Sequence, residues 1–159
     1  MARQKGEHTM ERLEFSARCS CIGFDAYVLA KQMSLSVDKT RPWFDMNWNA
    51  EVPATAVFTL TKAEQIHFQV IKSALALIHQ KTNGIAHGKT IKLPYWANQR
   101  KYDSLHKDAQ PCDYRIANAR LVALAQILSQ EGFDIQWVQP QEQFAYVISG
   151  NTLTADVRF

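Results

Sequence analysis

TKAEQIHFQVIKSALALIHQKTNG, residues 61–84, is the longest periodic stretch of this 159-residue chain. Thr61 and Glu64 match a capping box, in which a hydroxyl and a carboxylate satisfy free backbone N–H groups at a helix start. Asn83 and Gly84 are residues of the kind that end a helix in the left-handed conformation. Between these signals the apolar side chains cover more than one face, so such a helix packs on more than one side. The stretch therefore predicts the core helix of the fold.

Two further stretches predict helices. Residues 114–132, YRIANARLVALAQILSQEG, carry apolar side chains at helical spacing, with Asp113 as the N-cap and Gly132 as the stop. The sequence FDAYVLAKQMS, which begins at Phe24, predicts a shorter helix of about three turns. We therefore expect helices over about 61–83, 113–131 and 23–34.

Two stretches in the first half of the chain predict strands. Residues 12–21, RLEFSARCSC, alternate apolar and polar side chains without a break, which is the period of a half-buried strand. In that strand Cys19 and Cys21 both point to the core, where a free cysteine acts as a small hydrophobe. Residues 54–60, ATAVFTL, predict a short strand that runs directly into the core helix and has Phe58 on its apolar face.

The last part of the chain contains three strand-like segments with short links: DIQWVQ (134–139), QFAYVIS (143–149) and TLTADVRF (152–159). Short links favour antiparallel neighbours, so these segments predict a three-stranded meander. KTIKLP, residues 89–94, is a further strand-like segment that Pro94 ends. The predicted fold is α+β, a two-layer sandwich with the helices on one face of a mainly antiparallel sheet.

The composition is that of an ordinary globular protein, with 47% hydrophobic and 21% charged residues. We expect a flexible tail over residues 1–10 and a single domain over residues 11–159. No apolar run approaches the length of a membrane span, and the start lacks the apolar centre of a signal peptide. The expected location is therefore the cytoplasm, with no membrane partner and with free thiols rather than disulfides.

Positive charge is concentrated in one connection. Residues 81–107 hold six basic side chains against Asp103 alone, a net charge of +5 in a chain of net charge +3. Cations neutralise phosphate and aromatic rings stack on bases, and single-stranded nucleic acid is bound by this combination. Segment 85–107 therefore predicts a site for nucleic acid or another polyanion, formed by Lys89, Lys92, Tyr95, Trp96, Arg100, Lys101, Tyr102 and Lys107.

An alternative explanation of the same segment needs no ligand. Its aromatic rings would fasten a long connection to the body of the protein, and its cations would be solvated. A nucleotide hydrolase is excluded, because Gly84, Gly88 and Lys89 are one residue short of the phosphate-loop spacing and follow a helix rather than a strand.

Residues 36–53 show no period, and a connection of this length is often functional. The aromatic loop within it, residues 41–48, predicts a surface for a protein partner or a second copy of the chain. The alternative is a hydrophobic cover over the core. An open sheet edge is another feature through which such a module binds. The side chains assigned to partner binding are Trp43, Phe44, Met46 and Trp48.

Histidine chemistry provides a third hypothesis. His87 and His106 lie in the basic connection, and with Tyr102 and a lysine they would serve a metal-independent nuclease. Asp103, His106 and Asp108 are too few to predict a metal site, so we expect no metal and no cofactor.

The sequence thus favours a small non-catalytic binding or accessory domain that contacts nucleic acid or another polyanion. A protein-interaction or homo-oligomeric module is the alternative, and a His-dependent nuclease is the second alternative.

Overall fold

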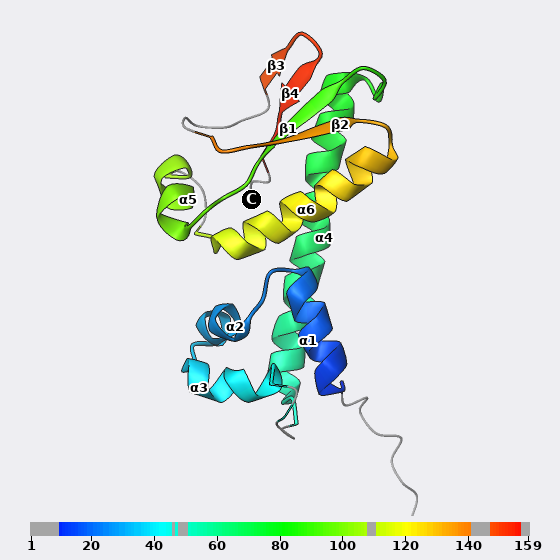
Figure 1. The fold of residues 1–159 in the computed structure, drawn as a ribbon. Coiled ribbons are helices and arrows are strands. Elements are labelled where there is room, and N and C mark those ends of the chain that lie inside the picture. Colours follow the sequence, from blue (N-terminus) through cyan, green and yellow to red (C-terminus); the bar gives the residue numbers. More distant parts are fainter. Residues whose placement is uncertain (1–9, 46, 48–50, 108–110, 141–146, 157–159) are drawn as a thin grey trace, which may run out of the picture. The chain divides into compact units, whose positions relative to one another are not determined.

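The computed structural model describes residues 10–45, 47, 51–107, 111–140 and 147–156. Over these residues the fold is α+β, with six α-helices, one short 3-10 helix and a mixed four-stranded sheet (Figure 1). The helices are α1 (Arg12–Cys21), α2 (Ala26–Met33), α3 (Val37–Thr40), η1 (Arg41–Trp43), α4 (Ala54–Thr82), α5 (Gln99–Leu105) and α6 (Tyr114–Gln130). The strands are β1 (Thr90–Pro94), β2 (Asp134–Val138), β3 (Val147–Ser149) and β4 (Thr152–Thr154). Within this described part of the chain, no helix combines the length and the apolar character needed to cross a bilayer.

The chain divides into two compact units, Met1–Gln65 and Ile66–Phe159. The first unit contains α1, α2, α3, η1 and the beginning of α4. The second contains the rest of α4, the sheet, α5 and α6. The single domain expected from the sequence stays a prediction, and the expected tail lies almost wholly outside the described residues.

Residues 12–21 form helix α1, so the strand predicted there is wrong. Phe15 and Cys19, one helical turn apart, are buried, whereas Leu13 is 54% exposed. A strand would put all three on one face, and a helix separates Leu13 from the other two. Cys21 is exposed for the same reason, because residues two positions apart on a helix point in nearly opposite directions.

An ion pair joins α1 to α4, and the capping box predicted at the start of α4 is wrong because the helix begins at Ala54. Arg18 donates from Nε and Nη2 to the Glu64 carboxylate at 2.8 and 2.6 Å. Arg18 also bonds Glu14, one turn earlier, at 3.2 Å, a spacing that stabilises a helix. Thr61 is inside α4, and its hydroxyl donates to the Val57 carbonyl at 2.9 Å.

The strand predicted over residues 54–60 is wrong as well, because α4 already begins at Ala54. Ala56 and Leu60, four residues apart, are fully buried, while Phe58 between them is 63% exposed. That burial follows the period of a helix and not of a strand. The β-branched residues of this stretch, which favour strands only weakly and in context, are overridden by packing.

The predicted C-terminal end of the core helix and both predicted ends of the second long helix are confirmed. Asn83 and Gly84 follow α4 with φ angles of 52° and 69°, both left-handed. Asp113 caps α6 by accepting a hydrogen bond from a backbone N–H of its first turn. Gly132, with a φ of 98°, ends the helix, and Phe133 folds back into the core. The shorter predicted helix corresponds to α2.

The sheet has the strand order β2-β1-β4-β3. β1 pairs in parallel with both β2 and β4, and β3 pairs antiparallel with β4. The predicted meander is therefore wrong apart from its last hairpin, since β2 and β3 lie at opposite edges. The physical reason is α6, which lies between β1 and β2 in the chain and provides the crossover that parallel neighbours require.

The core of the second unit joins α4, α6 and the sheet. Its fully buried side chains include Ile78 from α4, Leu124 from α6, Ile91 from β1 and Leu153 from β4. α6 packs against β1 and β2 (Figure 1). The two-layer sandwich that the sequence suggested stays a prediction.

The unequal burial of Cys19 and Cys21 provides a test of α1. Burial raises the pKa of the Cys19 thiol from 9.0 to about 12, so the folded chain keeps a proton that the unfolded chain releases. This stabilisation is complete below about pH 9 and is lost as the pH rises toward about 12. We expect the free energy of unfolding to fall less steeply with pH in Cys19→Ala than in the wild type, measured by urea unfolding under reducing conditions.

Cys21→Ala is the matched control and should leave the pH dependence of unfolding as it is in the wild type. Equal changes in the two variants would contradict the helical assignment, because a strand buries both sulfurs on one face.

Candidate functional site

The basic segment, residues 85–107, has part of its aromatic content in the core. Trp96 and Tyr102 are each 1% exposed, and their rings meet edge to face with centroids 5.2 Å apart. In this conformation neither ring can stack on a base. Tyr95 differs, because 52% of it is exposed.

His106 is also buried, next to these rings. Its Nε2 lies 2.6 Å from Oδ2 of Asp156, and the two side chains are 2% and 0% exposed. Its Nδ1 lies 2.8 Å from the backbone carbonyl oxygen of Tyr102. The Tyr102 ring stacks on the imidazole at 3.9 Å, and the Trp96 ring meets it edge to face at 4.7 Å.

These partners determine where the protons of the His106–Asp156 pair lie. A carbonyl oxygen can only accept, so Nδ1 carries a hydrogen. One more proton lies between Nε2 and the carboxyl oxygen, which makes the pair neutral as a whole. Because no substrate reaches a pair this buried, its role in this conformation is structural, and it joins the end of α5 to the residues after β4.

Burial also controls the other ionisable groups near Tyr102. It raises the pKa of the Tyr102 phenol and of the Cys112 thiol, which face each other. It lowers the pKa of Arg120 to about 10. A thiol with a raised pKa is a poor nucleophile, so Cys112 is not a catalytic candidate.

Two amide side chains hold the basic segment against α6. Asn118 bonds Trp96 twice, accepting from its backbone N–H and donating to its carbonyl, both at 2.9 Å. Gln99 donates to the Cys112 carbonyl at 2.8 Å and accepts from the Tyr114 N–H at 3.0 Å. The segment is therefore a fixed scaffold rather than a loose loop.

The cations of the basic segment remain at the surface. Arg100 and Lys107 are exposed, and Lys89, Lys92 and Lys101 are half-buried. Within the described residues no ion pair engages any of these five side chains.

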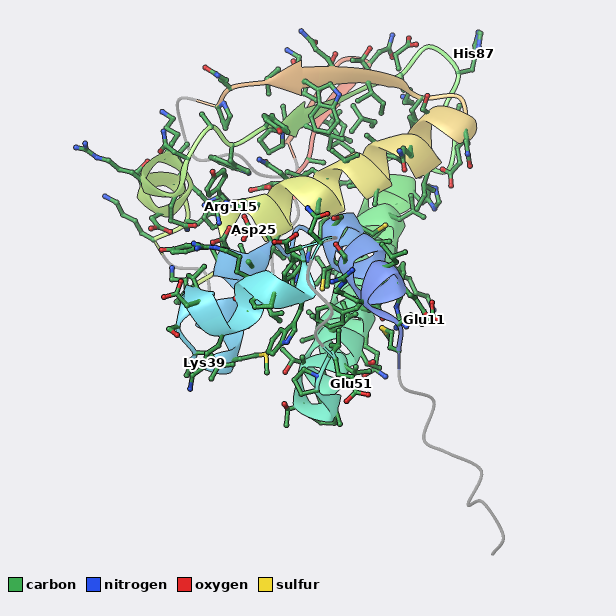
Figure 2. All side chains as sticks on the ribbon, turned by 60° about the horizontal axis from the view of Figure 1, so that its bottom comes forward. Glu11, Asp25, Lys39, Glu51, His87 and Arg115 are labelled. Carbon is green, nitrogen blue, oxygen red and sulfur yellow. The ribbon has the colours of Figure 1, made fainter. Side chains whose placement is uncertain are left out.

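His87, the other histidine of the nuclease hypothesis, lies in the turn between α4 and β1. It is exposed and points outward from that turn (Figure 2). The structure therefore does not combine an accessible His87 with an accessible His106. Among the described residues, no group of three or more His, Cys, Asp or Glu could hold a metal ion.

The aromatic loop belongs in part to the core of the first unit. Trp43 is 9% exposed, and its ring meets Phe15 edge to face at 6.4 Å. Phe44 packs on the same ring at 5.9 Å. These two side chains act as the hydrophobic cover. Met46 and Trp48, the other two residues predicted to bind a partner, lie outside the described residues.

An open groove of about 740 Å³ lies between α6 and β2. No charged side chain lines it; its walls are Val122, Ala125, Gln126, Ser129, Gln130, Ile135 and Trp137. Trp137 is 43% exposed and meets the exposed Tyr95 ring edge to face at 6.0 Å. An exposed aromatic pair beside an uncharged groove is typical of a binding surface.

β2 is the edge strand beside this groove. The Asp134 N–H donates to the Lys89 carbonyl, and the Val138 carbonyl accepts from the Tyr95 N–H. In a parallel pair, alternate residues turn their backbone groups to the neighbouring strand. The backbone N–H and C=O groups of Ile135 and Trp137 therefore point away from β1. Within the described residues no strand occupies that side.

Sequence reasoning missed this surface. The signal was present in DIQWV, where Ile135 and Trp137 share a face and the three middle residues carry no charge. Assigning the segment to a meander placed β3 beside it, whereas β3 lies at the opposite edge of the sheet.

Comparison with known protein families, with curated proteins and with solved structures finds no match to this chain.

The buried His106–Asp156 pair gives a prediction of stability. His106→Leu removes the imidazole beside a buried carboxylate, and we expect a loss of about 3–5 kcal/mol in the free energy of unfolding. His79→Leu is the matched control, because the pair of His79 with Glu131 is exposed by 39% and 33%. The free energy of unfolding of His79→Leu should fall by only about 0–1 kcal/mol. Equal losses in urea unfolding would contradict the structural role of the buried pair.

Proposed function

We propose that the chain is a non-catalytic protein-binding module that accepts an extended segment of a partner along β2. The observation that supports this most strongly is the outer edge of β2 beside the groove, along which no strand lies among the described residues. An extended peptide can add to such an edge through main-chain hydrogen bonds, while alternate side chains enter the neighbouring groove.

The groove determines the chemistry of the segment. Its lining is apolar or carries amide and hydroxyl groups, so it favours apolar and neutral side chains over charged ones. Trp137, half-exposed with Tyr95 beside it, is placed to anchor the contact, as tryptophan and tyrosine often do in interfaces.

The composition of the edge supports the same function. Edge strands that must stay monomeric usually carry lysine, proline or an inward charge. In β2 the only charged residue is Asp134, at its first position, and the middle of the strand is Ile135, Gln136 and Trp137. This edge lacks the usual protection against strand addition.

Selection from a displayed library of random peptides tests the proposal. We expect the wild type to enrich peptides with alternating apolar residues. Trp137→Lys, which places a charge in the groove, should lose their binding by about 30-fold or more.

Ile148→Lys is the control for this selection. Ile148 is also apolar, 47% exposed and on an edge strand, but it lies at the opposite edge of the sheet. Peptide binding should survive this change. The proposal fails if the protein enriches no peptide at concentrations where it is monomeric, or if the enriched peptides bind Trp137→Lys as tightly as the wild type.

Binding of nucleic acid or another polyanion is the second candidate. The observation that favours it is the set of five surface cations on a fixed scaffold, none of which is in an ion pair within the described residues. Tyr95 is the exposed ring in the basic segment that could stack on a base. Trp96 and Tyr102 offer no support for this candidate in their buried positions. The buried His106 likewise offers no support for the nuclease hypothesis.

Salt dependence separates the two candidates. If single-stranded nucleic acid binds here, Arg100→Ala/Lys101→Ala should weaken binding and reduce the slope of log K against log salt by roughly 1 to 1.5. Lys39→Ala/Lys72→Ala removes the same charge from exposed positions elsewhere and should leave the slope as it is. No binding to single-stranded RNA or DNA at low salt, measured by fluorescence anisotropy, would eliminate this candidate.

A further inference from the structure

The backbone of β2 has a self-complementary arrangement about Gln136. Ile135 and Trp137, on either side of it, turn their N–H and C=O groups to the open edge, whereas Gln136 turns its own groups to β1. We propose that the segment bound at this edge is β2 of a second copy of the chain, antiparallel and centred on Gln136. This inference rests on the proposed function, because it names the partner of the same edge.

The hydrogen bonds of such a pair follow from the register. With a two-fold axis at Gln136, Ile135 of each copy lies opposite Trp137 of the other. In an antiparallel ladder, opposite residues that face each other exchange both of their backbone bonds. All outward-facing groups of Ile135 and Trp137 are then satisfied, and none of them needs a different partner.

The side chains fit the same register. Ile135 and Trp137 lie on the groove face of β2, so each Ile135 is placed beside a Trp137 of the other copy. Aromatic and β-branched residues directly opposite one another stabilise a strand pair. The exposed Trp137 would thereby lose contact with water, and the two grooves would close on each other.

Charge does not oppose this pairing. Asp134 lies opposite Val138 of the other copy, and Gln136 lies opposite Gln136, so no like charges face each other across the strands. The grooves that meet are lined by uncharged side chains.

The opposite edge of the sheet fits a second copy less well. The groove between a helix and a strand lies beside β2.

Sedimentation across a range of protein concentrations measures the association. We expect the wild type to form dimers, Trp137→Lys to weaken the dimer by about 30-fold or more, and Ile148→Lys to leave it unchanged. A wild type that remains monomeric would overturn the inference, as would a dimer that Ile148→Lys weakens and Trp137→Lys does not.

Disulfide trapping tests the register in a chain whose exposed Cys21 is replaced by serine. Gln136 lies on the two-fold axis, where opposite Cα atoms are about 4.5 Å apart, within the range of a disulfide. Gln136→Cys should therefore oxidise to a covalent dimer. Asp134→Cys is the control, because its two copies would lie roughly 13 Å apart and cannot be bridged. Equal cross-linking of both variants would overturn the proposed register.

The two levels of the proposal can fail separately. A monomeric chain that still selects peptides through Trp137 would show that the edge binds a different protein, and only the second copy would be refuted. A monomeric chain that selects no peptide would refute both the second copy and the proposed function.

Discussion

The parallel pairing of β1 is the interaction on which the second unit depends. β1 bonds β2 on one side and β4 on the other, and its Ile91 and Leu93 are fully buried. Because β1 lies between β2 and β4, its register fixes the positions of both neighbouring strands. In β2, the backbone groups of Asp134, Gln136 and Val138 form hydrogen bonds with β1. The backbone groups of Ile135 and Trp137 therefore point to the outer edge.

Contacts of the residues that follow β1 and α5 explain why the basic segment is fixed. After β1 the chain is held by Asn118 on the Trp96 backbone, and after α5 by the His106–Asp156 pair. Rings that could have stacked on a ligand fill the core instead. What the segment presents to solvent is its cations and Tyr95, so its surface character is electrostatic more than aromatic.

Local sequence signals predicted several elements because the causes of those elements are local. Asp113 and Gly132 bound α6 through backbone geometry that neighbouring residues determine. The strands predicted in the first half of the chain were wrong because its helices form contacts with residues far away in the sequence. α1 is joined by Arg18 to Glu64, 46 residues later, and an apolar–polar alternation alone does not show which period packing will use.

The candidate site was predictable only in part for a similar reason. Charge localisation can be read along the chain, and the cations are at the surface as expected. Which rings are buried depends on three-dimensional packing, so Trp96 could not be distinguished from Tyr95 in advance. The open edge of β2 depends on strand order, and β1 reaches β2 only through the crossover that α6 provides.

We propose that the backbone groups of Ile135 and Trp137 are open in the isolated chain and become paired when a partner binds. Amide hydrogen exchange measured by NMR tests this directly. In dilute protein, we expect slow exchange at Gln136 and Val138 and fast exchange at Ile135 and Trp137. Exchange at Ile135 and Trp137 should slow as the protein concentration rises. Protection of Ile135 and Trp137 equal to that of Gln136 in the dilute monomer would contradict this proposal, because the edge would then already be covered.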